Sequence, residues 1–505
     1  MAQGMTVLAA VEHYAQQTPE SLALAGQHSS LSYAQLLPAL SSAEIAMRGV
    51  GSVIGLAVDN DPVWAVLDLA ALRLDLPVVP LPFFFSPEQI GHAIRDAGVD
   101  LLITDQAAAM KQILASQGIA IVSEATNLLG GKLLAQLQLQ VSRAELPKGT
   151  SKVTYTSGTT GKPKGVCLSS TAMQQVAQSL QQATNAVSDD RHLSLLPLTT
   201  LLENIAGLYV PLLAGATSIL LPSAQVGLSG AAGLDVGKML SALSNARATT
   251  TVMTPELLYA LVSVVEAGFP RPADLRFIAV GGASVSPRLL ERAAAAGLPV
   301  FEGYGLSECS SVVAVNTEQE NRPGTVGKPL PHARLKFAED GEILVQGACL
   351  LGYTAQPAAL EKGYWATGDI GHLDDDGYLH ITGRKKNIFI TSFGRNVAPE
   401  WVERELVLSM AIAQAAVFGE ARPWNAAVIV PAAGVSAMDI DLAIAEVNRQ
   451  LPDYAQVHAW ISVDAPFLPQ NGLLTANGRL RREAIWQIYQ NRINALYEES
   501  RNAVL

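Results

Sequence analysis

Short apolar runs alternate with amphipathic stretches up to about residue 383, and this alternation constrains the fold more than any other feature of the sequence. Two of the expected helices begin with a capping serine followed by proline, at Ser86-Pro87 and at Ser286-Pro287. Alternation of this kind is typical of an α/β fold built in layers, with mostly parallel sheets. The clearest candidates for buried strands are residues 53–58, 101–104 and 277–280.

From about residue 337 the pattern changes to short strands with tight turns, and the Asp376-Gly377 pair is a hairpin signal. A basic run at 383–387 follows, and a new helix is expected to begin at Pro399. The sequence therefore predicts a large N-terminal domain of α/β layers with a β-rich subdomain over 1–383, a connecting segment at 384–386, and a small α+β C-terminal domain over 387–505.

The composition excludes several classes of function. The chain has 505 residues, 49% of them hydrophobic, and a formal net charge of -11, so it can bury a large core and does not resemble a nucleic-acid-binding protein. Cys167, Cys309 and Cys349 are far apart in the sequence and match no zinc spacing. We expect them to be small core residues of a cytoplasmic protein.

No segment predicts a membrane span. The N-terminus lacks a basic region of the kind that opens a signal peptide. The uncharged stretch 205–221 is interrupted by Gly207, Pro211 and Gly215, so we expect a buried helix followed by a core strand. Peripheral contact with a membrane through an apolar patch stays open.

The stretch from Thr156 to Gly165 combines glycines, hydroxyls and lysines, directly after a strand-like run. Glycines let backbone N–H groups point inward, hydroxyls add donors and lysines offset charge, so the loop suits a polyphosphate. It is not a Walker loop, because the spacing of Gly158 and Gly161 is wrong and Pro163 stands where Ser or Thr is required. A P-loop kinase or ATPase is therefore not expected.

The same stretch, extended to 155–166, closely resembles the phosphate-loop signature of the adenylate-forming superfamily, which includes acyl-CoA synthetases, peptide-synthetase adenylation domains and luciferases. Bacterial long-chain acyl-CoA synthetase-like proteins are the most similar, on Leu196-Pro197-Leu198 and on 471–475. Each motif is weak alone, but their common order makes coincidence improbable. The further motifs, in the order of the superfamily, are 281–284, 304–308, 341–345 with 351–353, 364–369, 383–386 and 471–482.

The resemblance implies that a carboxylate attacks the α-phosphate of ATP, pyrophosphate leaves, and the acyl group then passes from the adenylate to a thiol. Because two anions meet, this chemistry needs a divalent cation and fixed positive donors. The implied cofactors are ATP, Mg2+ and coenzyme A. Glu308 and Thr156 would hold Mg2+, and the implied catalytic residues are Glu308, Arg479, Thr156 and Lys164.

The resemblance also implies a nucleotide site and a moving domain. Asp369 would bind the ribose hydroxyls, Tyr304 would stack near the adenine, and Arg384 would contact ribose or phosphate. Lys386 would lie at the pivot, and Gly394 near the pantetheine arm of the thiol donor. The implied binding residues are Thr156, Ser157, Gly158, Thr159, Thr160, Gly161, Lys162, Gly282, Ala283, Ser284, Tyr304, Gly305, Ser307, Asp369, Arg384, Lys386 and Gly394.

Two positions depart from the superfamily pattern. Thr200 stands where an aromatic residue or His is common near the substrate carboxylate, and Arg479 stands where the catalytic lysine normally lies. A planar guanidinium keeps the charge but does not replace a compact ammonium. Arg481 and Arg482 are neighbouring alternatives, although both are more typical of cations on a helix surface.

The resulting hypothesis is ATP-dependent activation of a small-molecule carboxylic acid, a medium- or long-chain fatty acid, followed by transfer to coenzyme A. Two alternatives stay open. One is transfer to an acyl carrier protein, or closure of a lactone; the other is a pseudoenzyme that binds nucleotide or acyl ligand, motivated by Arg479.

Overall fold

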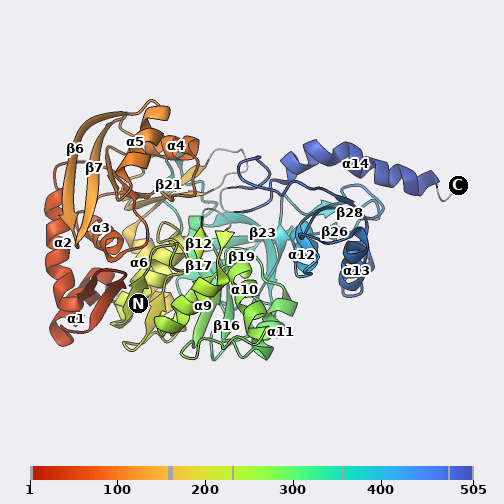
Figure 1. Cartoon of the computed structure of the whole chain (residues 1–505), viewed down its shortest axis with the longest axis horizontal. Coiled ribbons are helices and arrows are strands. Elements are labelled where there is room, and N and C mark those ends of the chain that lie inside the picture. Colours follow the sequence, from red (N-terminus) through yellow and green to blue (C-terminus); the bar gives the residue numbers. More distant parts are fainter. Residues whose placement is uncertain (1–3, 157–162, 230–232, 355, 476–477, 503–505) are drawn as a thin grey trace.

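The computed structural model describes residues 4–156, 163–229, 233–354, 356–475 and 478–502, with side chains up to residue 498 (Figure 1). Within these ranges no helix combines the length and the apolar character needed to cross a bilayer.

The large domain contains two nine-stranded sheets. In the first, all neighbours from β16 across to β1 are parallel, and only the flanking strands are antiparallel. Its order is β18 (Lys328–Pro329), β17 (Ser311–Val315), β16 (Val300–Leu306), β15 (Phe277–Val280), β14 (Thr250–Met253), β10 (Arg191–Leu193), β11 (Thr217–Leu220), β1 (Leu22–Gly26) and β2 (Ser30–Ser32).

The second sheet corrects the expectation of mostly parallel sheets. Only the neighbouring pairs β8–β4, β4–β3 and β3–β5 are parallel, and the other neighbouring pairs, such as β8–β9 and β6–β7, are antiparallel. Its order is β22 (Gln356–Pro357), β21 (Gly352–Tyr353), β9 (Lys164–Leu168), β8 (Lys152–Thr156), β4 (Val78–Pro80), β3 (Ile54–Ala57), β5 (Leu101–Thr104), β7 (Lys132–Gln140) and β6 (Ala120–Leu129).

One hydrophobic core joins the two sheets. It contains Leu24 and Leu220 from the first sheet, Ile54 and Leu101 from the second, and Trp64 from a helix that is buried along nearly its whole length. The expected serine caps at Ser86 and Ser286 are confirmed. The helices of this domain are α1 (Val7–Gln17), α2 (Tyr33–Met47), α3 (Pro62–Arg73), α4 (Pro87–Ala97), α5 (Ala107–Ser116), α6 (Ser170–Ala183), α7 (Leu201–Glu203), η1 (Asn204–Tyr209), α8 (Val210–Ala214), α9 (Val236–Asn245), α10 (Pro255–Glu266), α11 (Pro287–Ala295) and the short η2 (Ser307–Cys309).

A four-stranded antiparallel sheet forms the expected β-rich subdomain, and the Asp-Gly turn closes its last hairpin. Its strands are β19 (Ala333–Phe337), β20 (Glu342–Gly347), β23 (Trp365–Leu373) and β24 (Leu379–Arg384), and a separate small hairpin contains β12 (Leu228–Ser229) and β13 (Gly233–Leu234).

The C-terminal elements form an α+β unit, in blue at one end of the molecule in Figure 1. The helix expected at Pro399 begins there. The elements are β25 (Phe389–Ile390), β26 (Asn396–Val397), α12 (Pro399–Leu406), β27 (Ile412–Phe418), β28 (Asn425–Pro431), α13 (Ala437–Asn448), η3 (Asp453–Ala455), β29 (Val457–Ser462) and α14 (Arg482–Asn502).

The stretch 205–221 is a buried helix followed by core strand β11, as expected, but the helix begins as the π-helix η1. Residues five apart on an α-helix point about 140° away from each other. The wider π turn allows Asn204 and Tyr209 to reach the same carboxylate: Asn204 Nδ2 lies 3.2 Å and Tyr209 OH 2.7 Å from Asp68 Oδ2. The π turn is therefore explained by a shared buried partner on α3.

Lys152 of β8 completes this buried network. Its Nζ lies 2.8 Å from Asp68 Oδ1, donates to Asn204 Oδ1, and lies 5.7 Å from the centre of the Trp64 ring. Burial lowers the pKa of Lys152, and Asp68 acts in the opposite direction. The pair ties β8 to α3 and η1 inside the core.

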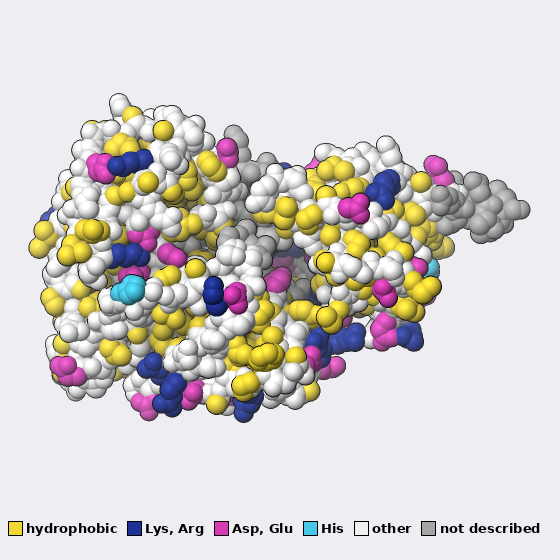
Figure 2. Space-filling model, in the orientation of Figure 1, with side chains coloured by type: hydrophobic (Ala, Val, Ile, Leu, Met, Phe, Trp, Pro, Cys, Tyr) yellow, Lys and Arg dark blue, Asp and Glu magenta, His cyan; other side chains and the backbone are white. Residues whose placement is uncertain are grey.

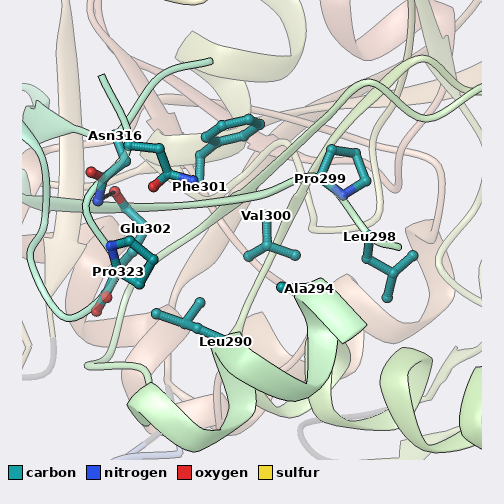
Figure 3. Close-up of a pocket in the computed structure, with 10 residues that line it drawn as sticks. Leu290, Ala294, Leu298, Pro299, Val300, Phe301, Glu302, Asn316 and Pro323 are labelled. Carbon is teal, nitrogen blue, oxygen red and sulfur yellow. Dashed lines mark hydrogen bonds between the residues drawn. The ribbon is translucent and has the colours of Figure 1, made fainter. Parts of the chain in front are cut away.

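A small cavity of about 120 Å³ lies between α11 and β16, walled mainly by apolar side chains such as Leu290, Leu298 and Val300 (Figure 3). Glu302 also lines it, is only 6% exposed, and accepts a hydrogen bond from Val285 N at 3.1 Å. Burial raises the pKa of Glu302 to about 7, against the effects of the Val285 amide and Arg404. Pockets for small-molecule ligands are usually about 300 Å³ or larger, so this cavity is a structural void.

We expect Lys152→Met to destabilise the large domain by about 3–5 kcal/mol, because it leaves the Asp68 charge buried without a partner. The measurement is the shift of the thermal and denaturant unfolding transitions. Lys111→Met is the matched control, since its ion pair with Glu124 is 40% and 39% exposed and is worth at most about 1 kcal/mol. Combining Lys152→Met with Asp68→Asn should recover part of the lost stability. Equal destabilisation by Lys152→Met and Lys111→Met would contradict the role of the buried Lys152–Asp68 pair in stability.

Glu302 should make the protein less stable as the pH rises. Its pKa is above the unfolded value of 4.5, so the folded state holds the proton more tightly. The resulting stabilisation is complete below pH 4.5 and is lost as the pH rises to about 7. The loss is at most about 3 kcal/mol. Glu302→Gln should therefore flatten the decline in melting temperature between pH 5 and 8, while Glu291→Gln, exposed on the neighbouring helix α11, should leave it unchanged.

Candidate functional site

The site is centred on Asp369, a buried residue of β23. Tyr304 OH donates to Asp369 Oδ2 at 2.7 Å, and Arg384 Nε lies 2.7 Å from Asp369 Oδ1. Burial raises the pKa of Asp369, while Arg384 and Tyr304 act in the opposite direction. Strands β16, β23 and β24 thus bring three of the sequence-predicted residues into direct contact.

Glu308 lies at the next turn, in η2, and its carboxylate is oriented by a residue that sequence reasoning did not assign to the site. Tyr353 OH donates to Glu308 Oε1 at 3.2 Å, and Lys164 Nζ lies 5.4 Å from the centre of the Tyr353 ring. Because β21 pairs with β9, Tyr353 connects Glu308 with Lys164. In the sequence, Tyr353 was marked only as part of the 351–353 motif.

Thr156 and Lys164 are the last pair of the β8–β9 hairpin before its loop, so they mark the two ends of the donor-rich segment. The base of this hairpin is fixed by polar contacts to α4. Tyr155 OH donates to Asp96 Oδ2 at 2.8 Å, and His92 Nε2 lies 2.8 Å from Pro163 O. The expected phosphate-binding residues Ser157, Gly158, Thr159, Thr160, Gly161 and Lys162 lie outside the described residues.

Arg479 reaches the site from the C-terminal domain. Its Nη2 donates to Gly282 O at 3.0 Å, in the exposed loop that follows β15 and also carries Ala283 and Ser284. The surrounding protein lowers the pKa of Arg479, as does Arg384, whereas Asp369, Glu308 and Glu400 act in the opposite direction. Arg479 is thus an exposed residue whose charge interacts with those of the large-domain site.

The two neighbouring arginines have other partners. Arg482, at the start of α14, forms a bidentate ion pair with Glu403, and its side chain is only 16% exposed. The interpretation of Arg482 as a cation on a helix surface is therefore wrong. Arg481 Nη1 donates to Gly472 O within the same C-terminal segment, at 3.2 Å. Of the three, Arg479 is the one that contacts the loop after β15 in the large domain.

The turn after Glu308 has a constrained backbone. Ser310 and Ser311 adopt φ values of 53° and 98°, which are unusual for residues other than glycine. A Cβ on Gly305 would lie 1.8 Å from Ser311 O, so only glycine fits. Ser307 contributes a carbonyl that accepts from Ser310 N at 3.1 Å. Strain of this kind is concentrated at functional sites.

The remaining predicted residues lie in the segment that follows β24. Burial lowers the pKa of Lys386, as do Arg384 and Arg479, while Glu400 and Asp369 raise it. Lys385 lies between Arg384 and Lys386 in the sequence, and its Nζ lies 2.6 Å from Asp340 Oδ2 and 2.7 Å from Glu342 Oε2. Gly394 lies in the exposed turn between β25 and β26, where its amide donates to Thr391 O.

The contact between Arg479 and Gly282 brings the C-terminal domain to the large domain that carries Asp369 and Glu308, and Figure 2 shows a recess between the two domains. One face supplies a buried carboxylate with an aromatic hydroxyl and a guanidinium, and a second carboxylate next to the hairpin of the donor-rich loop. The other face supplies Arg479. Such a set can bind sugar hydroxyls, phosphate oxygens and a divalent cation.

Comparisons with known proteins show the family to which the chain belongs. A family model described as "AMP-binding enzyme" matches residues 11–354, and one described as "AMP-binding enzyme C-terminal domain" matches residues 386–501. A long-chain-fatty-acid–CoA ligase of Mycobacterium bovis is 27% identical, with 86% of each chain covered. A 2-succinylbenzoate–CoA ligase of Bacillus subtilis is 28% identical over 81% of this chain and 85% of its own.

Solved structures extend the comparison. An o-succinylbenzoate CoA synthetase from Bacillus subtilis, in complex with its acyl-adenylate intermediate, gives a TM-score of 0.74 at 25% identity, covering 94% of this chain and 97% of that one. The same synthetase in complex with ATP and a magnesium ion gives 0.73 at 25% identity, covering 94% and 98%. With family models matching most of its length, the chain belongs to the AMP-binding enzymes of the adenylate-forming superfamily.

Proposed function

We propose that the protein is an AMP-forming acid–CoA ligase, which joins a carboxylic acid to AMP from ATP and transfers the acyl group to coenzyme A. The observation that carries this proposal is the contact of Arg479 with Gly282, which brings a cation of the C-terminal domain to the large domain that carries Asp369 and Glu308. Relatives of the chain are named as CoA ligases, which supports coenzyme A as the acceptor of the acyl group.

Asp369 is suited to bind the ribose of ATP. A carboxylate offers about four acceptor positions, and the protein uses one on each oxygen, for Tyr304 and Arg384. The two that remain match a pair of vicinal hydroxyls. Since both protein donors also fix the plane of the carboxylate, the ribose would be bound in one orientation.

The residues present also fit a magnesium ion beside the phosphates. Mg2+ prefers oxygen ligands. The Glu308 carboxylate accepts a hydrogen bond from Tyr353, whose ring lies next to Lys164 at the end of the donor-rich loop. Glu308 and Thr156 would hold the ion, which supplies charge neutralisation between ATP and the incoming carboxylate.

Arg479 would stabilise the charge that develops on the α-phosphate. In the first half-reaction a carboxylate oxygen bonds to the α-phosphorus while the bond to pyrophosphate breaks. In the second, the thiol sulfur of coenzyme A bonds to the acyl carbon and AMP leaves. Because Arg479 belongs to the C-terminal domain and contacts Gly282, this orientation of the domain would supply its guanidinium to the first half-reaction. The second would follow a rotation at the 384–386 hinge.

For the acid we propose a medium- or long-chain fatty acid. The helix after Thr200 presents buried apolar side chains, including Leu201, Ile205 and Leu208. A fatty-acid ligase is among the relatives, but so is a succinylbenzoate ligase. Carboxylate-dependent exchange of labelled pyrophosphate into ATP, measured over acids from acetate to palmitate and over aromatic acids, decides the substrate class. Absence of exchange with every acid would contradict the ligase and favour a nucleotide-binding protein, and a positive acid tested with coenzyme A or an acyl carrier protein identifies the acceptor.

Asp369→Ala should raise the dissociation constant of ATP with Mg2+, measured by calorimetry, roughly 10- to 100-fold, because hydrogen bonds to a charged group are lost. Asp375→Ala is the matched control, since Asp375 is exposed in the hairpin after the same strand. Unchanged affinity in the Asp369 variant would exclude the ribose role.

Arg479 variants should separate the two half-reactions. Arg479→Ala should lower pyrophosphate release by roughly 10²-fold or more, because a well-placed donor is lost, yet still convert synthetic acyl-adenylate to the thioester. We expect Arg479→Lys to release pyrophosphate faster than the natural chain, because a compact ammonium fits the α-phosphate better. Arg481→Ala is the control. If Arg479→Lys does not increase the rate of pyrophosphate release, arginine at position 479 does not limit the first half-reaction relative to lysine.

A further inference from the structure

Two of the three cysteines, which are far apart in the sequence, are in contact in the fold. The Sγ atoms of Cys309 and Cys349 lie 3.9 Å apart, and both residues are free thiols. Cys309 is 2% exposed, whereas Cys349 keeps partial contact with solvent. The third, Cys167, is buried on β9 in a different core cluster.

Backbone contacts hold this pair beside Glu308. Cys309 directly follows Glu308, and Leu350, directly after Cys349, donates its amide to Glu308 O at 2.7 Å. The segment continues to Tyr353, whose hydroxyl contacts the Glu308 carboxylate. The two chain segments that carry the thiols are therefore the ones that position Glu308 from both sides.

We propose that Cys309 and Cys349 form a reversible disulfide on exposure to hydrogen peroxide, and that this bond blocks adenylate formation by displacing Glu308. The claim that the disulfide blocks adenylate formation rests on the proposed function. Peroxide oxidises the Cys349 thiol to a sulfenic acid and releases water; Cys309 Sγ then attacks that sulfur, forms the S–S bond and releases a second water. The two thiols lose two electrons, and the O–O bond of peroxide is reduced.

The bond requires movement that the turn cannot absorb. An S–S bond is about 2.05 Å long, so the sulfurs must approach from 3.9 Å. On one side of Cys309, Ser310 and Ser311 already have left-handed backbones, and Ser311 O is packed against Gly305. The part of the approach that rotation of the cysteine side chains does not supply is therefore transmitted to Glu308. An error of about 1 Å in the position of a catalytic group can cost on the order of 10²-fold in rate.

The test treats the full-length protein with hydrogen peroxide and maps disulfides by mass spectrometry of the digested protein without reduction. We expect a peptide joining Cys309 to Cys349, a roughly 10- to 100-fold loss of pyrophosphate exchange, and recovery of activity with dithiothreitol. Cys349→Ser and Cys309→Ala should each keep basal activity and resist this loss, whereas Cys167→Ser should remain sensitive.

Each outcome bears on one part of the proposal. If no peptide joins the two cysteines, or if Cys349→Ser and Cys309→Ala are inhibited like the natural chain, the disulfide is not the cause and the proposal fails. A disulfide that leaves activity intact overturns its action on Glu308. If the reduced protein shows no exchange with any acid, calorimetry of ATP with Mg2+ gives the readout: oxidation should weaken binding at least tenfold, and unchanged binding overturns the proposal independently of the ligase function.

Discussion

The buried ion pair between Lys152 and Asp68 is the interaction on which the geometry of the large domain depends. Charges inside a core are tolerated only when they are paired and hydrogen-bonded. Here the pair fixes β8 against α3, and through Asn204 and Tyr209 it also sets the π turn of η1. The strand leads to Thr156 and the donor-rich loop, and the helix follows Thr200. A single buried contact thus determines the relative position of the proposed phosphate end and acyl end of the site.

The second determinant is the docking of the C-terminal domain. Arg479 contacts Gly282 O, and on the other side of the same loop Ser286 Oγ lies 3.1 Å from Glu405 Oε2. The C-terminal domain therefore holds the 281–286 loop at both ends. These two contacts are polar, and Leu408 adds an apolar contact with a core cluster of the large domain. Polar contacts of this kind are compatible with a domain that docks and releases, as two half-reactions at one site would require. Lys385, bound to Asp340 and Glu342, anchors the connecting segment to the large domain.

Local patterns predicted much of the fold. The strands at 101–104 and 277–280, the caps at Ser86 and Ser286, and the start of α12 follow from neighbouring residues alone, and the structure confirms them. The antiparallel strands of the second sheet were missed, because pairing direction depends on which distant segments meet. The π turn was missed for the same reason: its cause lies on α3, more than a hundred residues away in the chain.

The sequence by itself determined the chemistry available to this protein: the glycine- and hydroxyl-rich loop, the acids at 308 and 369, the arginine at 479, and the order of motifs that identified the superfamily. Only the tertiary structure decided which of these groups meet. Tyr353 contacts Glu308, Arg482 is engaged by Glu403 while Arg479 reaches the large domain, and Cys309 meets Cys349. The physical reason is that hydrogen bonds and ion pairs act over a few ångströms, and chain folding alone sets such distances between residues remote in sequence.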